Sequence, residues 1–339
     1  MNTNRPSVVV LGDTRGLYHH GCEAVLAGLS DGLASVDLPI TQTVQELDWT
    51  RERDLCLEAG LLVVNGEGSL HHDRDSVEQV LRLGEARASL GRKTVLVNSS
   101  WFANSTNHAA RLTAFSLVAA RDSRSASEMA TGGAKTIWAP DLAIRTAQAF
   151  ALPARGLGVL VGDSTRTELT ARLGDLAKQR GWPQVSILMP AIEVKPGAKA
   201  AKIRRRYRWA RALGPLGRAL VSERYRSHLD GLPDIASYSK ALSAHGSVVT
   251  GRFHTVCFCL GLGIPFLAIA SNIPKIQDLI RDAGLDPARR IIEPEQLAEV
   301  QSVPDFSPSE RTALETFLTQ AETRYQALFA SIAQVAATP

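Results

Sequence analysis

Two residues that can bind and protonate an anionic ligand, Arg252 and His254, stand between two short apolar runs of the sequence. The runs "SVVT" and "IPFLAIAS" are apolar and rich in β-branched residues, as is typical of parallel strands covered on both faces. Between them, "FHTVCFCLGLG" indicates a helix that ends at Gly263, just before Pro265. The pair therefore lies where a strand ends and a helix begins. In open α/β sheets ligands bind there, and the helix dipole favours an anion.

Three further loops follow predicted buried strands and carry polar side chains or glycines. Because the carboxyl ends of parallel strands share one edge of a sheet, we expect these loops to meet the Arg252–His254 pair. Gly66 and Gly68 would let a turn present backbone N–H groups to a ligand. The candidate ligand-binding residues are Asp13, Arg15, His19 and His20 in the first loop, Asn65, Gly66, Glu67, Gly68 and Ser69 in the second, and Arg121 in the third. Together they predict a cationic, histidine-rich cleft.

We expect no metal site and no resident cofactor. His71 and His72 are adjacent, so in an extended segment they would face opposite sides, and the chain has no helical HxxxH spacing for zinc. The four cysteines also fit neither a zinc nor a redox spacing: Cys22, Cys56, Cys257 and Cys259. Cys257 and Cys259 lie in an apolar helical stretch, where cysteine usually packs as a small core residue. A reactive role for Cys22, close to the first loop, stays open.

Strand-like apolar runs alternate with amphipathic helical stretches through most of the 339 residues. This alternation predicts an α/β protein of two Rossmann-like domains, each with a parallel, doubly wound sheet, that face a central cleft. We place the N-terminal domain at 1–153 and the C-terminal domain at 154–305, with "QVSILMP" as one strand of the second sheet. A final helix at 306–339 has Ser307 or Ser309 as its N-cap.

The composition is that of an ordinary globular protein, with 45% hydrophobic and 21% charged residues and a formal net charge of +4. We expect a cytoplasmic protein, because no apolar run could span a membrane and the N-terminus has no signal-peptide pattern. The segment 195–228 is strongly basic, with interleaved aromatic residues. Two interpretations of it stay open: contact with a polyanionic glycan or with the anionic inner face of the cytoplasmic membrane, or a solvated basic loop. Nucleic acid is not an expected partner.

Taken in order, the motifs of the chain resemble those of the polysaccharide pyruvyl transferase family. They read "LGDTRGLYHHGCEA", "VVNGEGS", "AARDSRSAS", "APDLA" and "TGRFHTVCFCLGLGIPFLAIASNIPK". The last is close to the family's "GRxHxxxxxxxxGxPxxxxxxxxK" signature and is the most specific. The resemblance implies a GT-B-type architecture. It also implies an enzyme that moves a pyruvyl group from phosphoenolpyruvate, its co-substrate, onto a sugar of a bacterial exopolysaccharide or lipid-linked precursor as a ketal.

By motif position, Arg252 and His254 correspond to the family's Arg-x-His pair, and Arg121 to the arginine that meets the donor anion. The chemistry of the residues agrees, because guanidinium groups bind phosphate and carboxylate in a forked geometry. A histidine can transfer protons near neutral pH. We therefore expect His254 to be the general acid and Arg252 and Arg121 to neutralise the donor, with Lys275 as a further substrate-binding residue of the last motif.

The first domain is then the acceptor side, where Asp13 or Glu67 is the candidate base or acceptor anchor. The chain departs from the family pattern on this side. Glu67 stands where another glycine is expected, and Leu142 replaces the usual proline after Asp141. The first loop is longer and carries "HHGC". These departures leave the acceptor sugar open.

Two other functions stay open. A glycosyltransferase of the same architecture would bind a nucleotide-activated sugar against the second domain. A non-catalytic member would bind a glycan or scaffold an assembly complex, and the intact Arg252–His254 pair argues against it.

Overall fold

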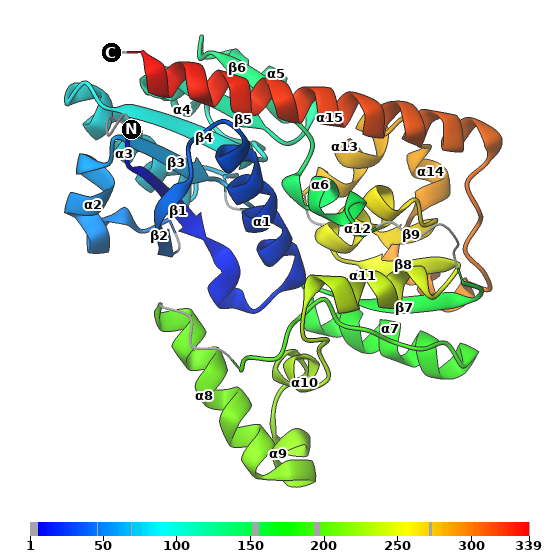
Figure 1. Ribbon diagram of the computed structural model, residues 1–339. Coiled ribbons are helices and arrows are strands. Elements are labelled where there is room, and N and C mark those ends of the chain that lie inside the picture. The colour runs from blue at the N-terminus through cyan, green and yellow to red at the C-terminus, as the bar shows by residue number, and fades with distance from the viewer. Residues whose placement is uncertain are drawn as a thin grey trace. The chain divides into compact units, whose positions relative to one another are not determined.

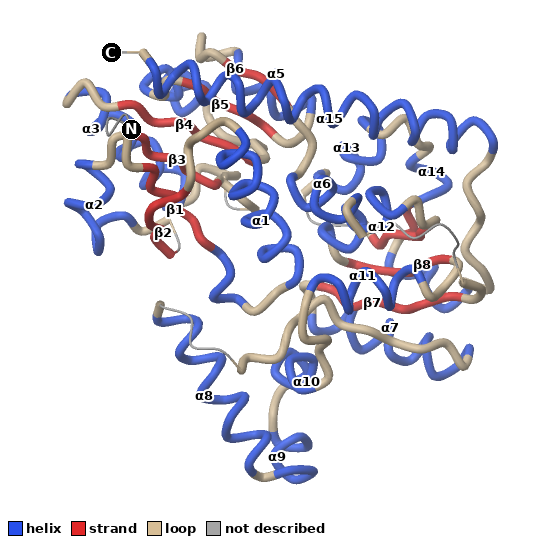
Figure 2. Tube along the Cα trace, in the orientation of Figure 1, coloured by secondary structure: helices blue, strands red, loops and turns tan. Residues whose placement is uncertain are grey.

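The computed structural model describes residues 6–45, 47–68, 70–150, 156–192, 197–270 and 273–338. The chain forms two compact units. Unit 1 comprises Met1–Thr14, Leu26–Leu142 and Thr319–Pro339, and unit 2 comprises Arg15–Val25 and Ala143–Leu318. Figure 1 follows the chain through both units, and Figure 2 shows that strands and helices alternate in each. Three helices have residues in both units: α1 (His20–Ser35), α6 (Leu142–Gln148) and α15 (Pro308–Ala337).

Unit 1 is built on a six-stranded parallel sheet in the order β2-β1-β3-β4-β5-β6. Its strands are β1 (Val8–Asp13), β2 (Ile40–Gln45), β3 (Leu61–Asn65), β4 (Lys93–Ser99), β5 (Leu117–Ala120) and β6 (Thr136–Trp138). The helices between them are α2 (Arg53–Glu58), α3 (Asp75–Ser89), α4 (Thr106–Arg111) and α5 (Ser123–Ala130). All residues of β1, β3 and β5 are buried, as expected for strands covered on both faces.

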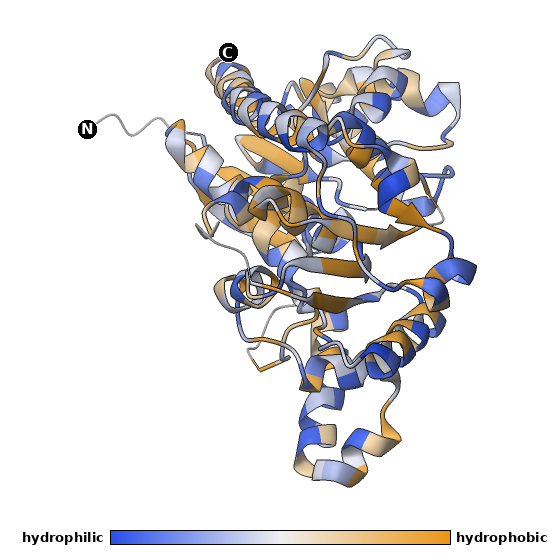
Figure 3. Ribbon diagram, turned by 90° about the vertical axis from the view of Figure 1, so that its right-hand side faces the viewer, coloured by the Kyte–Doolittle hydropathy of each residue, from blue (hydrophilic) through white to orange (hydrophobic). Residues whose placement is uncertain are grey.

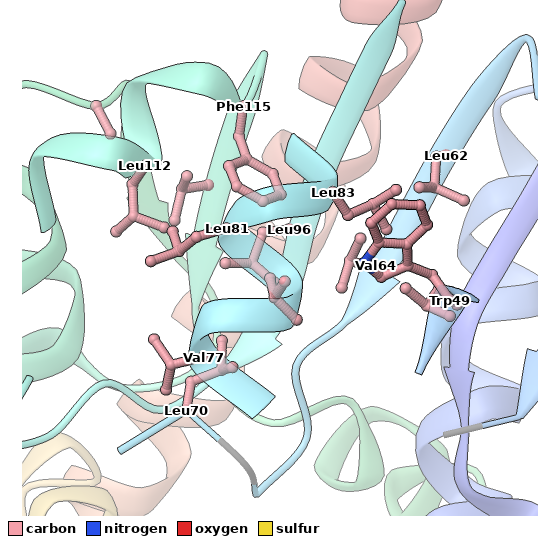
Figure 4. Packing of buried hydrophobic residues seen from close by; sticks show 14 of the residues in the cluster. Trp49, Leu62, Val64, Leu70, Val77, Leu81, Leu83, Leu96, Leu112 and Phe115 are labelled. Atoms are coloured by element: carbon pink, nitrogen blue, oxygen red, sulfur yellow. The ribbon is translucent and has the colours of Figure 1, made fainter. Parts of the chain in front are cut away.

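Apolar side chains from the helices and strands of unit 1 form one buried cluster (Figure 4). Leu81 of α3 and Leu96 of β4 belong to it, together with Phe115. Gly84 makes room for Phe115, because a Cβ at this position would lie 2.4 Å from the Phe115 ring. The buried guanidinium of Arg87 on α3 donates to the backbone carbonyls of four residues and to a threonine hydroxyl: Cys56, Leu57, Ala59, Lys93 and Thr94. These contacts hold the sheet in position under its helices.

Unit 2 has a four-stranded parallel sheet in the order β10-β9-β8-β7. Its strands are β7 (Val159–Ser164), β8 (Ser247–Gly251), β9 (Phe266–Ile269) and β10 (Ile291–Ile292). Its helices are α7 (Thr167–Arg180), α8 (Ala198–Ala212), α9 (Gly214–Leu220), α10 (Glu223–Leu229), α11 (Ile235–Ser243), α12 (Phe253–Leu262), α13 (Lys275–Asp282) and α14 (Pro287–Arg290). Two parallel α/β sheets in two units confirm the fold class expected from the sequence.

The predicted helix ends of α12 and α15 are also confirmed. Helix α12 ends at Gly263, whose φ of 68° lies in the left-handed region that glycine adopts without strain. At the start of α15 the Ser307 hydroxyl accepts from the Glu310 N–H (3.2 Å), and the Glu310 carboxylate accepts from the Ser307 N–H (2.8 Å). This reciprocal pair makes Ser307 the cap. The two cysteines of α12, Cys257 and Cys259, are buried in the core.

One expected strand is wrong, and one of the two interpretations of the basic segment is excluded. "QVSILMP" forms only two isolated bridges, between Gln184 and Val161 and between Leu188 and His19. Beyond Gln184 the backbone turns to the loop that precedes α1, where the Ile187 carbonyl accepts from the His20 N–H and the Met189 N–H donates to the Tyr18 carbonyl. The basic segment is not a loop, because its part from 198 onwards forms α8, α9 and α10, while Lys195 lies outside the described residues. In the part of the chain that the structure describes, no helix is long and apolar enough to cross a membrane.

Candidate functional site

In unit 2, the arginine between β8 and α12 is held by an aspartate from the neighbouring strand. Arg252 is the N-cap residue of α12, and its Nε and Nη2 donate to the two carboxylate oxygens of Asp163 on β7, at 3.1 and 2.9 Å. The pairing of β7 with β8 brings the two together, because Ser164 lies opposite Gly251. The Ser186 hydroxyl donates to the same carboxylate (2.9 Å). A forked pair of this kind fixes the guanidinium plane.

His254, in the first turn of α12, lies against the start of α1. The His254 and His19 rings meet edge to face with their centroids 5.4 Å apart. Gly21 permits this approach, because a Cβ there would lie 2.3 Å from Cγ of His254. The "HHGC" loop that departs from the family pattern therefore supplies a histidine and the glycine that accommodates the His254 ring.

His19 is held as a neutral hydrogen-bond donor. Its Nδ1 accepts from the backbone N–H of Gly21 at 3.0 Å, so the proton of the neutral ring is on Nε2. Burial lowers the pKa of His19 well below its ordinary value, and the charges of His254 and Arg252 lower it further. The ring thus stays uncharged at neutral pH.

His20 is enclosed more deeply than His19. Its ring stacks on Tyr238 of α11, with centroids 4.7 Å apart, and burial lowers its pKa to about 4. The Tyr238 hydroxyl bonds with the hydroxyl of Thr255 on α12 (2.9 Å). His20 and Tyr238 therefore connect the start of α1 with α11 and α12.

Two further predicted residues, Lys275 and Arg15, also belong to unit 2. Lys275 begins α13, and its ammonium lies 5.5 Å from the ring centroid of Phe253, the residue between Arg252 and His254. Arg15 lies in the short 3-10 helix Thr14–Leu17 and is partly exposed.

In unit 1, two carboxylates at strand ends are each held by a threonine. Asp13 ends β1, is buried, and accepts from the hydroxyl of Thr43 at 2.9 Å. Glu67 follows β3 and accepts from the hydroxyl of Thr14 at 2.8 Å. Both are acceptors in their ionised form, as a base or a hydroxyl anchor requires.

The turn after β3 is shaped by Asn65 and its two glycines. The Asn65 amide donates to the Gly12 carbonyl (3.1 Å), which ties the ends of β1 and β3 together. Gly66 cannot be replaced without movement, because a Cβ there would lie 2.0 Å from the Ser99 hydroxyl. Gly68 has a φ of 71° and faces open space. Ser69 lies outside the described residues.

Arg121 is buried at the end of β5 in an ion pair. Its Nη1 donates to Asp141 at 2.9 Å and its Nε to the Ser100 hydroxyl at 2.7 Å. Both side chains of the ion pair are at most 1% exposed. The next residue, Asp122, caps α5 by accepting from the Ser125 N–H at 2.7 Å.

Sequence reasoning missed three residues of the unit 2 cluster: Asp163, Gly21 and Tyr238. Asp163 had a usable signal, because "VLVGDS" is a buried strand that ends in an acidic residue, as β1 does at Asp13. Gly21 and Tyr238 had none, since their roles depend on which rings they meet. Within the described ranges, no group of three or more histidines, cysteines or acidic residues could hold a metal ion.

The chain was compared with known protein families and structures. The profile of the family described as "Polysaccharide pyruvyl transferase" matches residues 23–272. No curated protein matches. Among solved structures, a UDP-glucosyltransferase from Polygonum tinctorium, in a complex with 3,4-dichloroaniline, has a TM-score of 0.54 at 12% identity and covers 100% of both chains. A UDP-GlcNAc 2-epimerase from Neisseria meningitidis has a TM-score of 0.47 at 10% identity, over 94% of this chain and 93% of that one. The first of these likenesses shows the GT-B fold.

Proposed function

Because the chain belongs to the polysaccharide pyruvyl transferase family, and is therefore a transferase with a glycan acceptor, we propose that its donor is phosphoenolpyruvate. The acceptor is a sugar of a cell-surface polysaccharide or of its lipid-linked precursor, which receives the pyruvyl group as a ketal. The observation that carries the proposal is the cluster of unit 2, where a fixed arginine, a neutral histidine and His254 meet at a helix N-terminus.

The reaction needs both anion binding and proton transfer. The methylene carbon of phosphoenolpyruvate takes a proton, which makes the central carbon electrophilic. Two hydroxyls of the sugar then bond to this carbon, and the bond to the phosphate oxygen breaks. One of the two hydroxyl protons balances the proton given to the methylene carbon, and the other leaves with inorganic phosphate.

In the proposed mechanism, residues of unit 2 handle the donor. Arg252 binds its phosphate or carboxylate, and the N-terminal N–H groups of α12 add to the positive field. Asp163 keeps the guanidinium plane constant, so that little freedom is lost when the donor binds. His254 delivers the proton to the methylene carbon as general acid.

His19 donates a hydrogen bond from Nε2 to the same anion in this mechanism. Its low pKa matters, because an uncharged His19 leaves a proton on His254 undisturbed by a second cation. On the acceptor side, Asp13 or Glu67 receives the protons of the sugar hydroxyls. The threonine hydroxyls that hold them orient the carboxylates.

The test is release of phosphate from phosphoenolpyruvate with a panel of lipid-linked and aryl glycosides as acceptors. We expect release by the wild type to depend on an acceptor, and His254→Gln to lower kcat by about a hundred-fold to ten-thousand-fold. His245→Gln is the matched control, because His245 belongs to unit 2 but follows α11, and its side chain bonds to the Ala241 carbonyl of that helix. Equal activity of His254→Gln and the wild type would contradict the assignment of the acid.

Donor identity is tested separately by calorimetric titration. We expect saturable binding of phosphoenolpyruvate that Arg252→Met weakens. Saturable binding of nucleotide sugars, with none of phosphoenolpyruvate, would instead assign the chain to nucleotide-sugar glycosyl transfer.

A further inference from the structure

Positive charge is concentrated in one short stretch of unit 2, the helix pair α8–α9 with its flanks (197–222). This stretch carries eight lysines and arginines and no acidic residue: Lys199, Lys202, Arg204, Arg205, Arg206, Arg208, Arg211 and Arg218. The whole chain has a net charge of +4, so the remaining residues sum to 4 − 8 = −4. The basic charge is therefore a local feature of α8–α9.

One face of α8 is committed to the core of unit 2. Ala200, Ile203 and Tyr207 pack in a buried cluster with Tyr18 and Ala191. These positions recur every three or four residues, so they form one stripe along the helix. Many of its other residues are exposed, among them Lys202, Arg205 and Arg208.

The outward face of the helix pair is apolar as well as basic. Four large hydrophobic side chains are between 42% and 63% exposed: Trp209, Leu213, Leu216 and Leu220. Figure 3 shows this mixture of hydrophilic and hydrophobic residues on the helices at the bottom of the view. A run of exposed leucines and a tryptophan marks an interaction surface, because soluble surfaces seldom gather such residues.

Helix α8 also lines a pocket of about 510 Å³, to which it contributes three arginines. Arg204, Arg208 and Arg211 follow at helical spacing, with Tyr207 and Ile192 completing the wall. Guanidinium groups spaced in this way suit phosphate groups, to which they donate in pairs.

The helix pair is held as a fixed unit. Gly217 of α9 lets the two helices approach closely, because a Cβ there would lie 2.3 Å from the Ala210 carbonyl oxygen of α8. Arg218 of α9 forms an ion pair with Asp230, just after α10. The leucines and arginines are thus presented together.

We propose that α8–α9 is a docking surface for an anionic phospholipid bilayer. The arginines of the pocket bind lipid phosphates, while Leu216, Leu220 and Trp209 enter the interface between headgroups and acyl chains. The same face of a second copy does not fit here, because eight positive charges would meet eight. A nucleic acid matches the charge but leaves the exposed leucines in water.

The test measures sedimentation of the full chain with vesicles, without donor or acceptor, so its result is independent of the proposed pyruvyl transfer. Vesicles of phosphatidylcholine alone are compared with vesicles containing about one third phosphatidylglycerol, at low and high salt. We expect binding to the anionic vesicles only, weaker at high salt. The triple variant Arg204→Gln, Arg208→Gln, Arg211→Gln should bind about a hundred-fold more weakly.

Matched control variants distinguish binding through α8–α9 from a general effect of the protein's net charge or surface hydrophobicity. A control variant removes three exposed arginines outside the helix pair: Arg51→Gln, Arg82→Gln and Arg281→Gln. It should bind the anionic vesicles nearly as tightly as the wild type does. The double variant Leu216→Ser, Leu220→Ser should bind the vesicles about ten-fold more weakly. The control double variant Leu90→Ser, Leu157→Ser changes exposed leucines outside the helix pair and should not weaken binding. Circular dichroism checks that each variant is folded.

Three results overturn the proposal. One is equal binding to neutral and anionic vesicles. Another is vesicle binding that either α8–α9 variant leaves unchanged. The third is tighter binding to a short RNA duplex than to anionic vesicles, insensitive to the leucine substitutions, which would assign the surface to nucleic acid.

Discussion

Each unit has an arginine at the end of an inner strand that pairs with an aspartate, yet the two pairs differ in exposure and geometry. Arg121 and Asp141 in unit 1 are at most 1% exposed, and Arg121 divides its donors between Asp141 and Ser100. Arg252 in unit 2 is 13% exposed and turns one edge, Nε and Nη2, to Asp163. Asp163 thus leaves the Nη1 edge of Arg252 outside the pair.

The two arginine–aspartate pairs have different roles: one stabilises the fold and the other positions an arginine for a ligand. A fully buried pair stabilises a fold only while both charges are present, since either alone is costly in the interior. A pair that reaches the surface can hold an arginine in place for a ligand. Both arginines were expected to meet the donor from their motif positions. The geometry predicts that loss of Arg121 affects stability first and loss of Arg252 affects donor binding first.

The largest expected effect is on stability. Arg121→Met leaves Asp141 charged and buried, so we expect the free energy of unfolding to fall by about 3–5 kcal/mol. Arg252→Met should cost less, about 2 kcal/mol, because Arg252 is itself partly exposed and the Ser186 hydroxyl still donates to Asp163. Urea unfolding followed by tryptophan fluorescence measures both. Equal losses would show that the two pairs do not differ in this way.

Acid should destabilise unit 2 through His20. Burial sets the pKa of His20 at about 4 in the folded state, against 6.5 in the unfolded chain. Between these values the unfolded chain binds a proton that the folded protein does not, so the unfolding free energy falls as pH falls from 6.5 to 4. The full loss is about 3 kcal/mol. His19, whose pKa is also lowered, acts in the same direction.

Substitution tests this pH dependence. His20→Phe keeps a ring against Tyr238 but cannot titrate, so its unfolding free energy should depend less on pH in this window than that of the wild type. Hydrogen exchange should place the acid-sensitive amides around α11 and α12. An unchanged slope in His20→Phe would assign the acid sensitivity to other groups.

The fold could be predicted because its signals are local. Buried β-branched runs, Gly263 and Ser307 each specify a strand or a helix end through their immediate neighbours. "QVSILMP" misled because its apolar residues are buried, but against the loop before α1 instead of in the sheet. β2 has a polar sequence, "ITQTVQ", that becomes a strand only through its pairing with β1. An apolar sequence therefore predicts that a segment is buried, but the segment it packs against determines whether it forms a strand.

The site was predictable only in part for the same reason. Strand ends located Arg252 and His254, but the partner of Arg252 is 89 residues away and follows from the β7–β8 register. The contact of Gly21 with His254 follows from the placement of α1 against α12, which no local pattern encodes.

A substitution at Gly21 should affect catalysis more than stability. The added methyl of Gly21→Ala would displace the His254 ring, so we expect kcat for pyruvyl transfer to fall about a hundred-fold. Gly174→Ala is the control, because a Cβ there has ordinary contacts, 3.4 Å from Gln184. Phosphate release gives kcat, and urea unfolding should show a smaller change than for Arg121→Met. Full activity in Gly21→Ala would mean that the His254 position is not critical.

The smallest expected effect tests the role of the Arg252 fork directly. Arg252→Lys keeps the charge but cannot bind Asp163 and an anion through a planar group, so we expect affinity for phosphoenolpyruvate to fall about ten-fold. The unfolding free energy should change little, because a lysine still pairs with Asp163. Arg281→Lys, at an exposed site of the same unit, is the control for calorimetric titration. If Arg121→Lys, while still folded, weakened donor binding as much as Arg252→Lys, the buried pair of unit 1 would also take part in donor binding, and burial would not distinguish the two arginines.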